Sequence, residues 1–383
     1  MARRGARPER VPYTARVDAF RMRILHVSPF YEPFWAYGGM ARSSAALCRA
    51  LVRRGHDVRV ATALLGPGPP LEECMDGVRV RRFTGPRLLC RFRIPWAWGL
   101  GDFLDEELRT VDVVHLHGHR NGLAVTASRA LTAKHRPWVL VTAGTFPHHG
   151  QYRGVKAAFD MWAGRDVVER ATALVAVSQS EARDLPRPAL VIPNGVEACG
   201  DSPRVDLIGR RRILFVGSDR PQKRGHLLPA LIAAVPNAEL EVVGPVGAAF
   251  VRRFTALEGR VTFRGVLSGE ALAGAYASAD VLVHPAVGEA FGLVPFEAAL
   301  GGTPAVVAGG HGCGEWYGLG GGCVVPPDDP VALADAVSRR LADPALGRHE
   351  ANSVAAFVRS ELTWDKAAER FERLYDDVTR GSS

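Results

Sequence analysis

Two carboxylates, Glu289 and Glu297, stand eight residues apart on either side of Gly292. The apolar run 279–285 before them predicts a buried strand, and residues 294–300 predict the start of a helix. Backbone N–H groups at such a turn, together with the positive end of the helix, can bind a phosphate. A carboxylate there would repel a phosphate, so we expect each glutamate to bind hydroxyl groups of a ribose or a sugar. The pattern therefore favours a site for a sugar nucleotide.

A purely structural role is the alternative for this pair. Glutamate is common in the first turn of a helix because it complements the helix dipole, and short motifs have many false matches. The order of the elements around the pair therefore has to decide between ligand binding and helix capping.

Strands alternate with helices in two successive series. The strands predicted for the first series are residues 23–28, 58–62, 78–83, 112–117, 139–142, 173–177 and 189–192. Those predicted for the second are residues 212–217, 238–243, 260–263, 281–284, 304–307 and 322–325. Continuous apolar strands separated by helices indicate parallel sheets covered on both faces. The predicted fold class is α/β, with two Rossmann-like doubly wound domains facing each other across a cleft. Ligands in such sheets bind beyond the carboxyl ends of the strands.

The series divide the chain into five parts. They are an Arg-rich tail (1–21), a first domain (22–198), a linker (199–210), a second domain (211–363) and a C-terminal helix (364–383) expected to return to the first domain. The tail carries +4 of the net charge of +8, so the globular part is only mildly basic and predicts no nucleic-acid partner. The tail lacks the apolar core of a secretion signal, and Met22 is an alternative to Met1 as the start.

Composition limits the location and the redox chemistry of the chain. No run of 18 apolar residues occurs, so no membrane span is predicted, although the Arg-rich tail leaves a weak membrane-surface contact open. The six cysteines (48, 74, 90, 199, 313 and 323) have no paired metal-ligand spacing. We interpret them as buried thiols of a cytoplasmic protein rather than as a disulfide framework.

Several short segments occur in a characteristic order. They are MRILHVSPFY (22–31) followed by Gly38-Gly39, AVSQSE (176–181), IPNGV (192–196), FRG (263–265), SADV (278–281) and the segment 289–297. In this order and spacing, from Met22 to nearly the end, the chain resembles the retaining glycosyltransferases of GT-B fold, glycosyltransferase family 4 (group 1). The resemblance implies that the first domain binds an acceptor and the second a nucleoside-diphosphate sugar, without a metal or other cofactor.

The resemblance also implies roles for residues of the turn. Glu297 would bind the ribose hydroxyls, and Glu289 would contact the transferred sugar on its α face as a catalytic residue. The N–H groups of Phe291, Gly292 and Leu293 would meet the distal phosphate or the sugar. Further donor-binding residues would be Gly38, Gly39, Gly217 and Arg264, with the Gly38-Gly39 loop opposite the Glu289 turn.

The diphosphate needs cations because the leaving group gains negative charge as the glycosidic bond breaks. No Asp-x-Asp metal site is apparent in the sequence. Lys223, six residues after Gly217, matches the family lysine, but Ser218 stands where the family has an arginine. We expect Arg220 to replace that arginine, with Arg224 as the alternative.

A second departure lies after the strand 139–142. Many family members have His-Gly there, whereas this chain has Ala143 before Gly144. Either His148 or His149 replaces the imidazole, or no imidazole is needed because the departing phosphate oxygen takes the proton of the acceptor. We prefer the second route, with Gly144, Thr145, His148 and His149 on the acceptor side. We expect the loops 66–76 and 146–156 to determine which acceptor binds.

A further group of histidines alternates at the end of the strand 112–117. His115, His117 and His119 would share one face of that strand, an arrangement that suits a metal ion. No carboxylate or cysteine is near them in sequence, so we interpret them as packing and acceptor contacts. His26, on the first strand, is interpreted as a core residue.

The sequence thus predicts a retaining glycosyltransferase that moves a hexose or N-acetylhexosamine, most simply from a UDP-sugar, to a small hydroxylated acceptor. Arg- and Ala-rich usage is typical of a high-GC bacterium, so an aminocyclitol of antibiotic or other natural-product biosynthesis is the favoured acceptor. A cell-envelope glycan or lipid acceptor is the alternative. A sugar-nucleotide epimerase or hydrolase, or a nucleotide-sugar-binding protein without transfer activity, also stays open.

Overall fold

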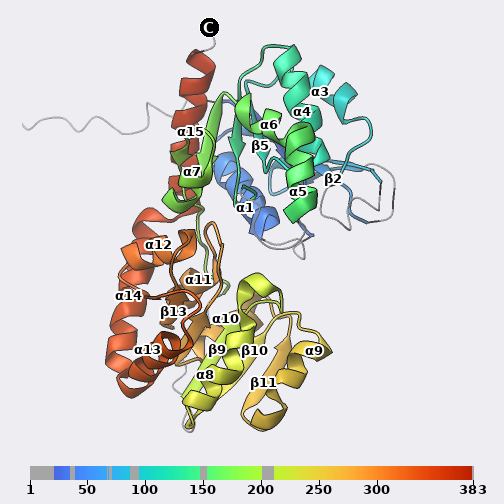
Figure 1. The fold of residues 1–383 in the computed structure, drawn as a ribbon. Helices are drawn as coiled ribbons and strands as arrows, with labels where there is room; N and C mark the ends of the chain where they lie inside the picture. Colours follow the sequence, from blue (N-terminus) through green and yellow to red (C-terminus); the bar gives the residue numbers. More distant parts are fainter. Residues whose placement is uncertain are drawn as a thin grey trace, which may run out of the picture.

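The computed structural model describes residues 21–34, 39–66, 68, 71–86, 95–146, 153–200 and 211–381. Within them the chain forms two α/β lobes, each built around one sheet (Figure 1). The predicted α/β fold with two parallel, Rossmann-like sheets is therefore confirmed.

The first sheet comes from the N-terminal half of the chain. Its strands are β1 (Arg23–Ser28), β2 (Asp57–Ala63), β3 (Leu71–Met75), β4 (Val78–Phe83), β5 (Val113–His117), β6 (Trp138–Val141), β7 (Ala173–Ala176) and β8 (Leu190–Val191). Its helices are α1 (Gly39–Arg53), α3 (Leu100–Glu107), α4 (Gly122–Ala133), α5 (Arg153–Phe159), the π-helical turn η2 (Asp160–Gly164), α6 (Arg165–Glu169) and α7 (Gln179–Asp184). The strand order is β3-β4-β2-β1-β5-β6-β7-β8, and only the β3–β4 pair among these described strands is antiparallel.

Strand β3 corrects two predictions. Residues 66–76 are predicted as a loop, but residues 71–75 form an edge strand antiparallel to β4. The β3 side chains are exposed or half-buried, so no apolar pattern marks the strand in the sequence, and the free edge of β4 decides its pairing. Cys74 on this edge is exposed rather than buried, whereas Cys48 and Cys313 are buried as expected.

The second sheet comes from the C-terminal half. Its strands are β9 (Arg211–Val216), β10 (Ala238–Val243), β11 (Val261–Gly265), β12 (Val281–His284), β13 (Ala305–Ala308) and β14 (Cys323–Val325). Its helices are η3 (Pro221–Lys223), η4 (Gly225–Leu227), α8 (Leu228–Ala234), α9 (Ala248–Val251), η5 (Arg252–Leu257), α10 (Gly269–Ala277), α11 (Val294–Leu300), α12 (Gly312–Leu319), α13 (Pro330–Ala342) and α14 (Pro344–Glu361). The order is β11-β10-β9-β12-β13-β14, and all these pairs are parallel.

The last helix, α15 (Trp364–Arg380), lies beside the N-terminal lobe (Figure 1). Its apolar face buries Ala367, Phe371 and Leu374, which the sequence places on one side of the helix. Glu372 accepts hydrogen bonds from Arg54 Nε at 2.5 Å and Nη2 at 2.7 Å, and lies 2.8 Å from Nε2 of His56. Charge pairing and apolar packing therefore attach the end of the chain to α1 and to the start of β2.

Apolar layers cover both faces of the first sheet. Ile24 and Val58 pack on the side of α1 and α15, whereas Leu25 and Val114 pack on the side of α3 and α4. This division follows from the alternation of side chains along each strand. In the part of the chain that the structure describes, no helix is long and apolar enough to cross a membrane.

Candidate active site

The Glu289 carboxylate lies between two basic side chains. It follows β12, whose last residue is His284, and precedes α11, so the predicted strand–turn–helix order is confirmed. Lys223 Nζ donates a hydrogen bond to Oε1 of Glu289, and His284 Nε2 lies 3.1 Å from Oε2. The Glu289 side chain is only 17% exposed. One carboxylate and two bases therefore form a compact group at the carboxyl ends of the second-sheet strands.

The charges of this group favour an ionised carboxylate. Burial by itself would raise the pKa of Glu289, but the charges of Lys223 and His284 outweigh it and hold the pKa well below its usual range. His284, Glu289 and Cys313 also offer ligand atoms within 4.8 Å of one another. Because Lys223 already neutralises the carboxylate, we interpret the group as a carboxylate–ammonium site rather than as a metal site.

Gly292 is required by the geometry of the turn. Its φ is +73°, and a Cβ on it would lie 2.5 Å from Oε2 of Glu289 and 2.8 Å from Sγ of Cys313. Among the described residues, the backbone N–H groups of Phe291, Gly292 and Leu293 donate to no protein acceptor. The turn thus presents unpaired donors close to an ionised carboxylate, as expected of a site that binds a phosphate or a sugar.

Glu297, in the first turn of α11, is almost fully buried. Tyr276 donates a hydrogen bond of 2.8 Å to Oε2, and Arg42 on α1 lies 3.8 Å from Oε1. Burial and the nearby Glu297 carboxylate raise the pKa of the Cys199 thiol to about 12.

Glu297 lines a cavity of about 320 Å³ between the lobes. The other lining residues are Arg42, Ala46, Arg49, Gly195, Glu197, Ala198, Cys199, Ser268, Gly269, Leu272, Leu293 and Trp364.

The predicted cations differ in their surroundings. A Cβ on Gly217 would lie 3.6 Å from Cδ of Lys223, so the glycine leaves room for the lysine stem beside β9. Arg220 is exposed and directly precedes the turn η3. Arg224 is bound to Asp328 at 2.8 Å, and Arg264 lies 3.5 Å from Glu241. Of the two arginine candidates, Arg220 has the side chain that is not held in an ion pair among the described residues.

The acceptor-side loop faces the Glu289 turn. Gly144 has a φ of +79°, and a Cβ on it would lie 3.0 Å from Cβ of Ala290, the neighbour of Glu289. Ala143, at the position of the missing histidine, also has a positive φ, +46°. Thr145 Oγ1 lies 2.9 Å from Nδ1 of His119. The structure therefore brings Gly144, Thr145 and the Glu289 turn together, and places His119, already interpreted as a packing or acceptor contact, beside Thr145.

A buried carboxylate with no role predicted from the sequence holds this loop in place. Glu181 accepts hydrogen bonds from N–H of Gly144 at 2.5 Å, N–H of Val177 at 2.8 Å and Oγ1 of Thr142 at 2.8 Å. It belongs to the segment 176–181, so its place in the ordered motifs was the only signal in the sequence.

Helix α12 of the second lobe binds the start of α7 in the first. The Glu315 carboxylate accepts hydrogen bonds from N–H of Gln179 at 2.9 Å and of Ser180 at 2.8 Å. The indole N–H of Trp316 donates to the carbonyl of Val177 at 2.8 Å. These bonds fix how the acceptor loop and the donor turn face each other.

Several residues of the predicted site lie outside the described residues or at their edge. Gly38, His148 and His149 lie outside them, as do residues 1–20 and 201–210. Gly39 is the first residue of α1 and is exposed.

Comparison with known families agrees with this geometry. The family profile described as "Glycosyltransferase Family 4" matches residues 37–198, and "Glycosyl transferases group 1" matches residues 210–343. The chain belongs to glycosyltransferase family 4. Together the two matches cover most of both lobes, so the predicted family is confirmed.

Similar curated proteins include D-inositol 3-phosphate glycosyltransferases and glycogen synthases. D-inositol 3-phosphate glycosyltransferase of Corynebacterium diphtheriae is 28% identical, over 93% of this chain and 94% of its own. Glycogen synthase of Mycobacterium tuberculosis is 29% identical, over 94% of this chain and 96% of its own. These relatives span nearly the whole length of the chain.

Solved structures show that this family 4 chain has the GT-B fold. Sucrose-phosphate synthase from Thermosynechococcus elongatus superposes with a TM-score of 0.74 at 22% identity, over 94% of this chain and 100% of its own. Anabaena HepE in complex with UDP-glucose superposes with a TM-score of 0.69 at 18% identity, over 93% and 100%.

Proposed function

We propose that this family 4 glycosyltransferase moves a hexose or N-acetylhexosamine from a UDP-sugar to a small hydroxylated acceptor, with retention of the anomeric configuration. The observation that carries the proposal is the Lys223–Glu289 pair beside the unpaired N–H groups of residues 291–293. An ammonium group and free N–H donors suit a diphosphate, and an adjacent carboxylate suits the hydroxyls of a sugar.

The donor half of the site would use both glutamates. Glu297, held by Tyr276, lines the cavity at the start of α11, where it can accept hydrogen bonds from ribose hydroxyls. Glu289 lies in the turn between β12 and α11, beside Lys223, the cation that would bind the diphosphate. Two solved structures of this fold are titled as complexes with UDP-glucose and UDP-2-fluoro glucose, which supports a UDP-sugar donor.

The chemical step would follow a same-face route. The bond between the anomeric carbon and the phosphate oxygen breaks, and the acceptor oxygen bonds to that carbon on the same face. The acceptor proton passes to the departing phosphate oxygen, so the step needs no imidazole at Ala143. Lys223 and the N–H groups of the turn stabilise the charge of the leaving diphosphate, and Glu289 stabilises the positive charge that develops on the sugar. No metal ion is needed in this scheme.

The acceptor we favour is a cyclitol. Relatives along the whole chain are named D-inositol 3-phosphate glycosyltransferases, and an inositol is a small polyhydroxylated ring, as is an aminocyclitol. Gly144 and Thr145 would line its side of the site, opposite Ala290. A cell-envelope glycan or lipid is the alternative acceptor.

Release of nucleoside diphosphate tests the proposal. The full chain is incubated with UDP-glucose, UDP-N-acetylglucosamine and the GDP-, ADP- and TDP-sugars, with and without inositol, inositol phosphate and aminocyclitols. Turnover that requires a cyclitol, with an α-linked product by NMR, supports the proposal. Turnover of the donor alone would indicate a hydrolase or epimerase, and binding without turnover would indicate a binding protein.

A further inference from the structure

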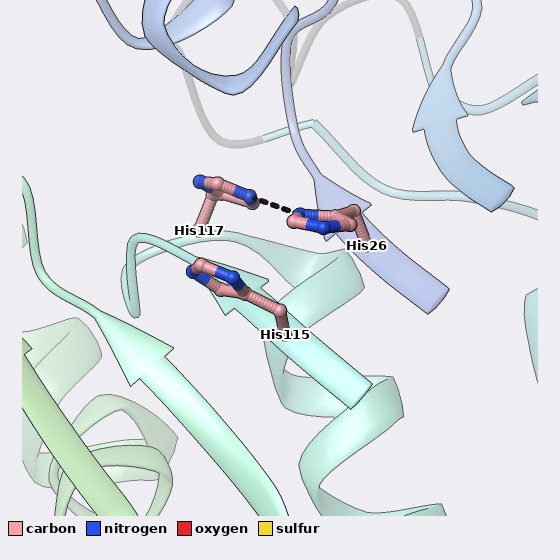
Figure 2. A group of neighbouring side chains, drawn as sticks. All are labelled: His26, His115 and His117. Carbon is pink, nitrogen blue, oxygen red and sulfur yellow. Dashed lines mark hydrogen bonds between the residues drawn. The ribbon is translucent and has the colours of Figure 1, made fainter. Parts of the chain in front are cut away.

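Three buried histidines meet beneath the C-terminal helix, away from the Lys223–Glu289 pair. His26 comes from β1, and His115 and His117 come from the neighbouring strand β5, where the register pairs His26 with His115 (Figure 2). Their ring centroids lie 4.3–5.2 Å apart. One ligand nitrogen from each ring lies within 4.8 Å of the others. Spacing along the chain relates only His115 and His117; the pairing of β1 with β5 brings His26 beside them.

The hydrogen bonds of the trio are incomplete. Nδ1 of His26 lies 2.9 Å from Nε2 of His117, the contact drawn in Figure 2. Among the described residues, Nε2 of His26 and Nε2 of His115 have no partner, although both rings are fully buried. A buried polar atom without a partner is unfavourable, and Nε2 of His115 is one such atom that a bound ion would satisfy.

A hydrogen bond with a neighbouring side chain favours the tautomer of His115 that a metal ligand requires. Tyr375 Oη on α15 lies 2.6 Å from Nδ1 of His115. When Nδ1–H donates to this hydroxyl, Nε2 is left with its lone pair, as is usual for a metal-bound histidine with an outer hydrogen-bond partner. In His26 and His117 the proton can sit on the outer nitrogen, so the two facing nitrogens can both present lone pairs.

We propose that His26, His115 and His117 bind one divalent transition-metal ion of the zinc class, as a structural site that joins β1, β5 and α15. Neutral imidazoles are good ligands for Zn²⁺, and Zn–N distances of about 2.0–2.1 Å place tetrahedral ligands about 3.3 Å apart. The facing nitrogens of His26 and His117 lie 2.9 Å apart and all ligand atoms lie within 4.8 Å. The His115 and His117 rings are stacked at an interplanar angle of 10°, so these rings must turn about their side-chain bonds for all three lone pairs to point at one ion. A water molecule would be the fourth ligand. This ion would stabilise the fold and take no part in sugar transfer.

Metal content and cobalt spectroscopy of the tag-free full chain test this inference. The chain is stripped with a chelator, dialysed, and titrated with Zn²⁺ and with Co²⁺. We expect one equivalent bound, a visible Co²⁺ d–d spectrum of a tetrahedral nitrogen site, and a rise in Tm on adding Zn²⁺. A chain that binds neither ion, or a Co²⁺ spectrum of an octahedral aqueous ion, would overturn the inference.

Variants distinguish this site from adventitious binding. His26→Gln and His115→Gln should abolish the tetrahedral spectrum, whereas His349→Gln, at an exposed position far along the chain on α14, should leave it unchanged. Tyr375→Phe keeps all three ligands but removes the hydrogen bond to His115, and should weaken metal affinity by about 10–100-fold. It serves as the decisive variant should the glutamine substitutions fail to fold. If Tyr375→Phe and a folded His26→Gln both bound the metal with the affinity of the unaltered chain, the three histidines would be excluded as the site.

Discussion

Lys223 and Glu289 are bound to each other, although the sequence assigns one to a diphosphate and the other to a sugar. Without a donor, each neutralises the other at the carboxyl ends of the second-sheet strands. A bound nucleotide sugar would bring a phosphate to the ammonium group and hydroxyls to the carboxylate. The pair therefore holds two opposite charges in place, and their attraction offsets part of the desolvation cost of each until a ligand separates them.

Replacing Lys223 tests this pair directly. Lys223→Met should lower kcat by about 100- to 1,000-fold, because a cation that stabilises the leaving group in a water-poor site is lost. The pKa of Glu289 should also rise, since the main charge that lowers it is removed. Both are measured from the pH profile of UDP release. Lys134→Met, which removes an exposed surface pair with Asp105, is the control and should keep the wild-type rate.

Glu297 can be tested through donor binding alone. Glu297→Ala should weaken the binding of UDP and the UDP-sugar by about 1–3 kcal/mol, because a charged hydrogen bond to ribose is lost. Isothermal titration calorimetry measures the affinity, with Glu258→Ala at an exposed position as the control. Unchanged affinity in a folded Glu297→Ala chain would remove this residue from the ribose role.

Ala143 tests whether an imidazole is needed. Its positive φ of +46° is one that histidine tolerates better than most residues, so Ala143→His should fold with little loss of stability. We expect activity to stay low or the choice of acceptor to change, because the same-face route does not require a base. Steady-state rates over an acceptor panel decide this. A large gain in rate with the original acceptor would show that the natural chain lacks a useful catalytic group.

The Glu372 cluster should make stability depend on pH. Burial would raise the pKa of Glu372, but His56 and Arg54 outweigh it and lower the value to about 2. Because the folded pKa lies below the ordinary one, this contribution is complete above about pH 4.5 and is lost as pH falls toward 2. Glu372→Gln should therefore lower the free energy of unfolding by about 1–3 kcal/mol at pH 7, with a smaller difference near pH 3.

Chemical denaturation at both pH values measures the effect of Glu372→Gln. The matched control is Glu369→Gln on the same helix, which loses an exposed i,i+4 pair with Arg373 and should cost about 0.5 kcal/mol or less. Equal losses in the two variants would mean that the pairing of Glu372 with Arg54 and His56 does not fasten α15 to the N-terminal lobe.

The sequence by itself determined the features that depend on local periodicity and spacing. An apolar run of strand length predicted β12, and the residues after it predicted the start of α11. The position of the turn that carries Glu289 and Gly292 therefore followed from the sequence. The amphipathic period likewise predicted α15 and its buried face. These are properties of a few consecutive residues, which the backbone geometry of strands and helices translates directly into position.

Only the tertiary structure decided which distant residues meet. Lys223 and Glu289 are 66 residues apart, and His26 and His117 are 91 apart; strand order and register bring each pair together. Strand β3 likewise forms because β4 offers a free sheet edge to pair with. Glu181 anchors the acceptor-side loop because the N–H of Gly144, in that loop, donates to its carboxylate. Such contacts depend on how the whole sheet is assembled and packed, and no local pattern in the chain encodes that assembly.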